Sequence, residues 1–257
     1  MNKYLNLKKS YIFVLFMLFL FFPLSSSFSK EKINIGYFSL EPHTISENNK
    51  HLGAIIEFWE KYIAPEMNVE LNWRGPLPPL RLFKSLENGE VNVIALLAKN
   101  PDRVKIFDFP NESFFIMEAG IAVTSDSKLN KINSVNDLFS LNLGFFQDGF
   151  IPPTLRDKRI KWNLVPATDW QTTNFNKLIA KRIDAAFNPE SLSLIYEAKR
   201  LNIKNKVKIL VIPNTKSELY SVFTKKDNGK YLKKYNQIIS DKGIKEKYLG
   251  LLQKYIK

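Results

Sequence analysis

The chain has 257 residues, a formal net charge of +13 and no cysteine. This length can form one sizeable core or two smaller ones, and the lack of cysteine excludes disulfides and a lipidated cysteine anchor. The positive charge would suit nucleic acid or an anionic membrane, but the lysines are scattered, and there is no Arg-rich arm, zinc motif or aromatic RNA-binding motif. We therefore expect a solvated basic surface and no nucleic-acid partner.

Residues 1–29 have the pattern of a secretory signal peptide. Three lysines precede an apolar run from Tyr11 to Phe22, and serines follow it. The run is short for a membrane span, although an uncleaved N-terminal anchor is the rival interpretation. Cleavage after Ser29 would remove three lysines and no acidic residue, which leaves +10 on the mature protein. An exported protein with no lipid anchor needs a closed compartment, so we expect a Gram-negative periplasm.

The first half of the mature chain alternates strand and helix patterns. Strands are predicted over residues 33–38, 68–73 and 91–97. Helices are predicted over residues 52–64 and 79–88, and Pro65 should stop the first of them. The polar segment 39–50 is predicted to be a surface loop.

Helix-start residues follow the apolar strand 91–97. Asn100 is a good N-cap, Pro101 suits the first helical position, and Arg103 stands in the first turn. Backbone N–H groups and a guanidinium should therefore lie together at the carboxyl end of a buried strand. In open α/β sheets ligands bind at that end, and this combination favours an anion.

The second half repeats the alternation. Strands are predicted over 118–125, 141–146, 159–165, 206–212 and 219–224. Helices are predicted over 135–139, 169–181, 188–201, 231–240 and 244–255, and another should begin at Pro152 and Pro153. The lysines of the last two helices are expected to form a solvated face, with a membrane-surface role as the weaker alternative.

The stretch from Gly89 to Pro110 resembles the hallmark of bacterial extracellular solute-binding proteins of family 3, the periplasmic proteins that serve amino-acid transporters. In that family a Gly-x-x-Asp strand leads to a Thr-x-x-Arg turn and an Asp-Phe-Ser-x-Pro-Tyr segment. Arg103 holds the position of the arginine that grips the ligand's carboxylate. Asn92 replaces the aspartate and Asn100 the threonine, and the last motif is followed only loosely. The resemblance identifies the chain as a divergent member.

The resemblance extends into the second half, where two ligand-binding positions differ. Gly144 and Gly149 resemble the glycines of a Gly-x-x-x-Gly-Thr turn, with four residues between them instead of three, but Phe150 replaces the hydroxyl residue that completes the carboxylate site. The run from Arg182 to Asn188 resembles the family's Gly-x-x-Asp-Ala segment, which leads to an aspartate that holds an α-ammonium group. Asn188 is uncharged and cannot neutralise that group, so a standard α-amino acid is a less favoured ligand.

The resemblance implies an α/β, two-lobed, type II periplasmic-binding-protein fold, in which each lobe is a central mixed sheet flanked by helices and two crossovers join the lobes. Lobe 1 should comprise residues 30–125 and 216–257, and lobe 2 residues 126–215. The ligand should lie between the lobes. The predicted ligand-binding residues are Tyr37, Phe38, Trp73, Ala98, Asn100, Arg103, Gln147, Asp148 and Asn188. Tyr37, Phe38 and Trp73 would wall the apolar side, although each could instead be a core aromatic residue.

The predicted function is capture of a small polar, acidic or zwitterionic solute in the periplasm for uptake by an inner-membrane ABC permease.

Two alternatives remain open. A sensory or partner-binding descendant would have lost tight ligand binding, and a dehydratase-like enzyme would use one cleft carboxylate, Asp148 or Glu190. The only histidines are His43 and His51, and their spacing with Glu41 matches no zinc motif. We expect a monomer with no enzymatic activity, metal or cofactor.

Overall fold

The computed structural model describes residues 30–48 and 50–257. Glu31–Lys257 forms one compact unit. The predicted signal peptide, residues 1–29, lies outside the described residues.

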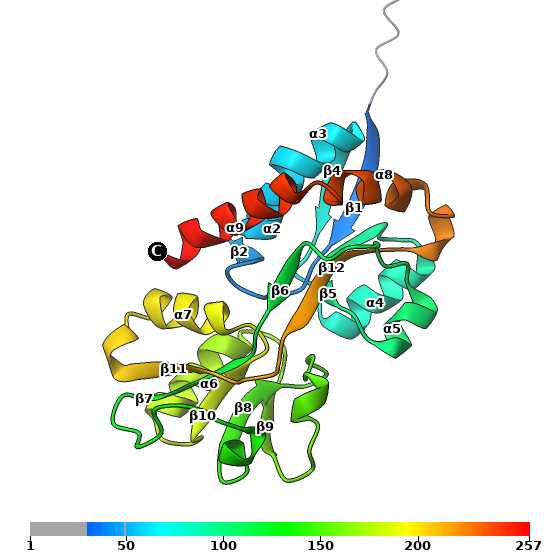
Figure 1. Cartoon of the computed structure of the whole chain (residues 1–257). Coiled ribbons are helices and arrows are strands. Elements are labelled where there is room, and N and C mark those ends of the chain that lie inside the picture. The colour runs from blue at the N-terminus through cyan, green and yellow to red at the C-terminus, as the bar shows by residue number, and fades with distance from the viewer. Residues whose placement is uncertain (1–29, 49) are drawn as a thin grey trace, which may run out of the picture. The chain divides into compact units, whose positions relative to one another are not determined.

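The first of two five-stranded sheets has the order β4-β1-β5-β12-β6 (Figure 1). Its strands are β1 (Glu31–Gly36), β4 (Val69–Arg74), β5 (Val93–Ala98), β6 (Phe115–Met117) and β12 (Ser217–Phe223). β1 pairs in parallel with β4 and β5, and β12 pairs antiparallel with β5 and β6. Every residue of β5 is buried, as its continuous apolar run predicts.

The second sheet has the order β11-β7-β10-β8-β9. Its strands are β7 (Gly120–Thr124), β8 (Asn142–Phe146), β9 (Lys161–Val165), β10 (Ala185–Asn188) and β11 (Val207–Val211). β8 is parallel to β9 and β10, whereas β7 is antiparallel to β10 and β11. Both sheets are therefore mixed.

The helices accompanying the first sheet differ from the prediction around Pro65. They are α2 (Ala54–Phe58), η1 (Trp59–Ile63), α3 (Ala64–Met67), α4 (Pro79–Asn88), α5 (Pro101–Ile106), η5 (Lys225–Asp227), α8 (Lys230–Ile239) and α9 (Lys242–Ile256). Pro65 was expected to stop the helix, but η1 is a π-helical turn and the helical path continues to Met67. Pro65 stands in the first turn of α3, where a missing N–H is tolerated.

The helices accompanying the second sheet are η2 (Val135–Leu138), η3 (Pro153–Leu155), α6 (Trp170–Ile179), α7 (Ser191–Arg200) and η4 (Lys204–Lys206). The predicted helix at Pro152 and Pro153 is only the 3-10 turn η3. α7 packs on β7, β10 and β11 and also contacts α9.

Two chain segments connect the sheets and bond to each other. Ile212 N–H donates to the Ala119 carbonyl at 2.8 Å, and Ala119 N–H donates to Thr215 Oγ1 at 3.0 Å. In Figure 1, β6 and β12 lie side by side next to these segments, consistent with their pairing. Gly120–Thr124 pairs within the second sheet, whereas the predicted boundary at residue 126 would place this strand in lobe 1. The boundaries of the two lobes remain predictions.

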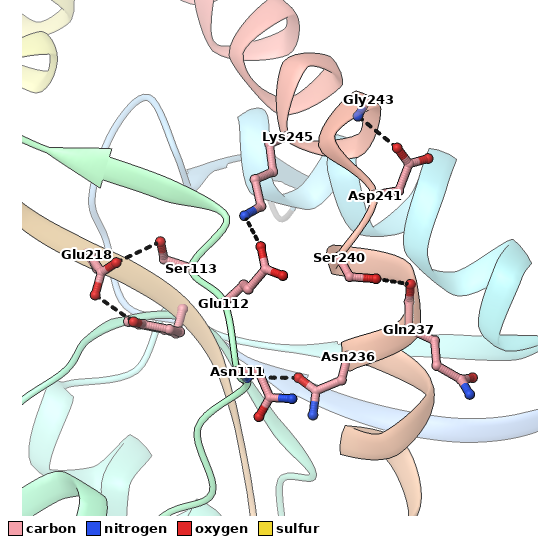
Figure 2. Close-up of polar contacts among 11 residues, drawn as sticks. Asn111, Glu112, Ser113, Glu218, Asn236, Gln237, Ser240, Asp241, Gly243 and Lys245 are labelled. Carbon is pink, nitrogen blue, oxygen red and sulfur yellow. Dashed lines mark hydrogen bonds and ion pairs between the residues drawn. The ribbon is translucent and has the colours of Figure 1, made fainter.

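Polar contacts tie the segment before β6 to the C-terminal helices (Figure 2). Asn111 N–H donates to Asn236 Oδ1 at 2.9 Å, and Lys245 pairs with Glu112 at 2.5 Å. Ser113 Oγ donates to Glu218 Oε1 at 3.4 Å. The first two contacts connect α8 and α9 with the segment before the edge strand β6, and the third connects that segment with β12.

The segment predicted to be a surface loop contains a short hairpin, β2 (Ile45–Glu47) and β3 (Lys50–Leu52). His43 precedes it and is fully buried, with Nδ1 hydrogen-bonded to the Tyr248 hydroxyl. The surface interpretation was therefore wrong for His43, because its ring packs against Phe115 and Tyr248.

Candidate functional site

Arg103 stands at the start of α5, as the capping pattern predicted. Asn100 is the N-cap, and its Oδ1 accepts a hydrogen bond from Arg103 N–H at 2.8 Å. Arg103 Nη1 donates to the Ala98 carbonyl at 2.7 Å. The end of β5 and the first turn of α5 thus hold the guanidinium.

Aromatic rings lie close to this guanidinium on two sides. Its central carbon is 5.1 Å from the ring centre of Phe83 and 5.8 Å from that of Phe150. Burial lowers the pKa of Arg103 to about 10, and Arg156 contributes to the decrease. Among residues 30–48 and 50–257, no ion pair involves Arg103. This partly buried cation therefore lacks a counter-ion in the described part of the chain.

Arg103 lines a first cavity of about 40 Å³. Most of its lining is apolar, and Arg103 and Asp148 supply its charged side chains. The lining residues are Phe38, Leu40, Pro79, Phe83, Leu97, Ala98, Arg103, Met117, Phe146, Asp148, Gly149, Phe150, Pro189 and Leu219. They come from both sheets or from the segments next to them.

Two further cavities continue from the first. The second, of about 270 Å³, shares Phe38, Pro79 and Phe146 with it. The third, of about 510 Å³, shares five residues with the second: Ser39, Glu41, Ser46, Asp169 and Trp170. The three cavities therefore form a series that starts at Arg103.

The structure brings four of the predicted ligand-binding residues together around the first cavity: Phe38, Ala98, Arg103 and Asp148. Asn100 lines none of the three cavities but caps the helix that carries Arg103. Phe150, the residue that replaces the family's hydroxyl, lines the first cavity beside Arg103.

The other predicted residues do not line these cavities. Tyr37 is fully buried, and its hydroxyl bonds to His51 Nδ1 at 2.6 Å. Trp73 packs edge-on against Tyr37 and donates its indole N–H to Glu60 at 3.1 Å. Gln147 is exposed. Ligand contact by these three residues remains a prediction.

Asn188, at the end of β10, is also fully buried and outside the three linings. Its Oδ1 accepts a hydrogen bond from Glu190 N–H at 2.9 Å, whereas Nδ2 has no partner among the described groups. The amide thus organises the turn into α7, and its contact with a ligand remains a prediction.

Several acidic residues near these cavities were missed by sequence reasoning. Glu41, Glu47, Asp169 and Glu197 line the third cavity, and they come from three separate segments of the chain. One sequence signal was available for Glu197, because it shares a helix face with the apolar Leu194 and Ala198. No motif linked it to Glu41 or Asp169.

The sequence pattern of bacterial extracellular solute-binding proteins, family 3, matches residues 33–257. The chain belongs to this family. Comparison with curated proteins finds no significant match for this family member. Within the described residues, no helix is long and apolar enough to cross a membrane.

Solved structures support the same fold for this family 3 protein. An ancestral arginine-binding protein bound to arginine has a TM-score of 0.72 at 20% identity, covering 89% of this chain and 99% of the other. The periplasmic VFT2 domain of Bordetella pertussis BvgS gives 0.73 at 14% identity, covering 87% and 93%. The amino acid ABC transporter substrate-binding protein AbpA from Streptococcus pneumoniae, bound to L-arginine, gives 0.70 at 19% identity, covering 88% and 94%. The predicted type II periplasmic-binding-protein fold is confirmed.

Proposed function

We propose that this protein is a periplasmic solute-binding protein that captures a small, carboxylate-bearing solute between its two sheets for uptake by an inner-membrane ABC permease. Arg103 carries the proposal. Its guanidinium is partly buried and bonds to the Ala98 carbonyl, but no ion pair neutralises it within the described residues. A carboxylate could accept two parallel hydrogen bonds from such a group and supply the missing charge.

The cavity sizes support a ligand that extends beyond Arg103. The first cavity, about 40 Å³, has room for a group of about the size of a carboxylate. The rest of the solute would pass Phe38, Pro79 and Phe146 into the second cavity. Apolar walls beside a charged anchor are typical of a site for small organic molecules.

Both sheets contribute to this route, which supports a role for closure. Phe38 follows β1 of the first sheet, and Phe146 ends β8 of the second. A ligand that contacts both would stabilise the closed arrangement, which the permease could then recognise. We propose a monomer with lobes at 30–125 plus 216–257 and at 126–215, located in the periplasm after removal of the signal peptide.

The site supports binding rather than catalysis. Glu190, one of the two carboxylates considered for an enzyme, lines none of the three cavities. Asp148 lines the first cavity but is exposed to solvent, unlike a carboxylate held in a desolvated catalytic site. The proposed role is therefore non-enzymatic.

A thermal-shift screen of the mature protein tests this function. The panel includes amino acids, dicarboxylates, amines, short peptides and sugars, each with wild type, Arg103→Ala and the control Arg182→Ala, which changes an exposed arginine outside the three cavities. A ligand at 100 times its Kd should stabilise the folded state by about 2.7 kcal/mol. We expect an acid to stabilise wild type and the control but not Arg103→Ala.

Equal shifts in all three proteins would refute the role of Arg103. No shift with any compound would refute solute capture and favour a partner-binding descendant, whereas turnover of a bound acid would favour an enzyme.

A further inference from the structure

The first cavity is apolar around Arg103. Apart from Gly149, every lining residue other than Arg103 and Asp148 has a hydrocarbon or thioether side chain. Phe38 follows β1 and Phe150 follows β8, so segments next to both sheets contribute rings to the wall. A solute group that enters this space therefore exchanges water for hydrocarbon contacts, except at the guanidinium and the exposed Asp148.

The Arg103 guanidinium has donors to spare. Its Nη1 donates to the Ala98 carbonyl at 2.7 Å, which is the one hydrogen bond of the guanidinium among the described residues. The other N–H groups can donate to both oxygens of one carboxylate. The carbon attached to that carboxylate would then lie among the apolar side chains of the first cavity.

An ammonium group on that carbon would need an anion beside it. Asp148 supplies the carboxylate of the lining, but this residue is exposed. Water therefore screens the attraction between Asp148 and a cation. An α-ammonium group held near Arg103 would consequently lose its own water without gaining a buried counter-ion.

The polar side chains between β10 and α7 offer no substitute. Asn188 Oδ1 accepts a hydrogen bond from Glu190 N–H at 2.9 Å, and Glu190 Oε1 accepts one from Leu192 N–H at 2.9 Å. Neither Asn188 nor Glu190 lines the first cavity. Their hydrogen bonds organise the start of α7.

Backbone acceptors around the cavity are also in use. Besides the carbonyl already bonded to Arg103, the Phe38 carbonyl accepts a hydrogen bond from Thr44 Oγ1 at 2.7 Å. The Leu219 carbonyl accepts one from Phe114 N–H at 3.1 Å. An ammonium group brings three N–H donors. Burying these donors without partners is costly, whereas burying a methylene in the same place is favourable.

We propose that the solute is a hydrocarbon acid, meaning a carboxylate whose neighbouring carbon carries no ammonium group, rather than an α-amino acid. This inference rests on the proposed function, because it takes Arg103 as the anchor of the carboxylate. The first cavity, about 40 Å³, holds the carboxylate. The hydrocarbon chain passes Phe38 and Phe146 towards the second cavity, which shares both residues.

Calorimetric titration of the mature protein with matched pairs of acids tests this class. Propanoate, pentanoate and octanoate are each compared with the 2-amino acid of the same carbon chain, namely alanine, norvaline and 2-aminooctanoate. The members of a pair differ only in the α-ammonium group at neutral pH. Pentanamide is the control that lacks the carboxylate. We expect the best-bound alkanoate to bind wild type about a hundredfold more tightly than its amino acid partner, and pentanamide not to bind.

Three variants identify the groups responsible. Arg103→Ala should weaken alkanoate binding by roughly a hundredfold, whereas Arg182→Ala, which changes an exposed arginine outside the three cavities, should bind like wild type. Asp148→Asn removes the carboxylate of the lining. This variant should keep the preference for the alkanoate over the amino acid. Far-UV circular dichroism shows whether each variant is folded.

An amino acid that binds wild type as tightly as its alkanoate would overturn the hydrocarbon-acid class, and selective loss of that amino acid in Asp148→Asn would assign the ammonium group to Asp148. If Arg103→Ala loses both ligands in that case, the proposed capture of a carboxylate survives. If no acid of either kind binds, or Arg103→Ala binds them as wild type does, the proposed carboxylate capture at Arg103 fails together with the ligand class.

Discussion

Glu190 gives a strong test of the electrostatics of this fold. It is 1% exposed at the start of α7, where Oε1 accepts a hydrogen bond from Leu192 N–H at 2.9 Å. Oε2 is buried and has no partner among the described groups. Burial raises the pKa of Glu190 from 4.5 to about 8, and Glu118 contributes to the rise. The substitution Glu190→Gln keeps the accepting oxygen and removes the ionisation.

The sign and size of the effect follow from proton linkage. Between pH 4.5 and about 8 the folded state holds a proton on Glu190 that the unfolded state has released. The free energy of unfolding therefore falls as the pH rises through this window, by about 1.4 kcal/mol per unit. From pH 5 to pH 7 the loss is about 3 kcal/mol. The contribution of protonated Glu190 to the free energy of unfolding is fully present below pH 4.5 and is lost by about pH 8.

Urea unfolding at a series of pH values measures this difference. Wild type should lose more stability between pH 5 and pH 7 than Glu190→Gln, by about 3 kcal/mol. Glu41 also has a raised pKa, so the comparison of the two proteins, rather than the wild-type slope alone, isolates Glu190. Glu246→Gln, on the exposed face of α9, should keep the wild-type slope. Equal slopes for wild type and Glu190→Gln would refute the reasoning, because Glu190 would then be ionised in the folded protein.

Three further predictions concern stability. Ser221→Ala should lower the free energy of unfolding by about 1–3 kcal/mol, because the buried indole N–H of Trp59 donates to Ser221 Oγ at 3.1 Å; urea unfolding that shows no loss would contradict this. Gly144→Ala should destabilise the protein by about 1–3 kcal/mol, since a Cβ would lie 2.5 Å from a side-chain carbon of Ile183. Gly250→Ala, in α9 with open space around it, should stabilise the protein by about 0.5–1 kcal/mol. Thermal melting that ranks the two variants in the opposite order would refute the packing argument. Burial lowers the pKa of His43 to about 3, so wild type should lose stability as the pH falls from 6.5 toward 3, and His43→Phe should lose less over this window in the same urea assay.

The parts of the fold with strong local signals were predictable from sequence. The helix 79–88 was predicted with its observed bounds because Pro79 suits a first turn. In the structure, Gly89 ends it in the left-handed conformation. Asn100 was correctly predicted to cap α5, since its side chain bonds to a backbone N–H three residues away. Both signals lie within about one turn of helix.

The parts that depend on distant contacts were not predictable. The helical path continues through Pro65 because the preceding turn widens into a π-helix. The spacing of apolar residues does not predict a π-helical turn. His43 looked like a loop residue because its partner, Tyr248, lies about two hundred positions along the chain. The lining of the third cavity was not predictable for the same reason, because Glu41, Asp169 and Glu197 are far apart in the sequence and come together only in the folded protein.

The burial of Asn188 and the charge of the third cavity bear on the same question of ligand recognition. The Asn188 Oδ1 is occupied by the N–H of Glu190, and the residue lines no cavity in the series, so a cationic group on the ligand gains no neutralising partner there. Glu41, Glu47 and Asp169, which form no ion pair within the described residues, line the third cavity instead, beyond the second. A carboxylate-bearing solute that extends from Arg103 would contact segments of both sheets along its length, because Phe38 follows β1 and Phe146 ends β8. The length of the solute, as well as its charge, would therefore be a determinant of selectivity.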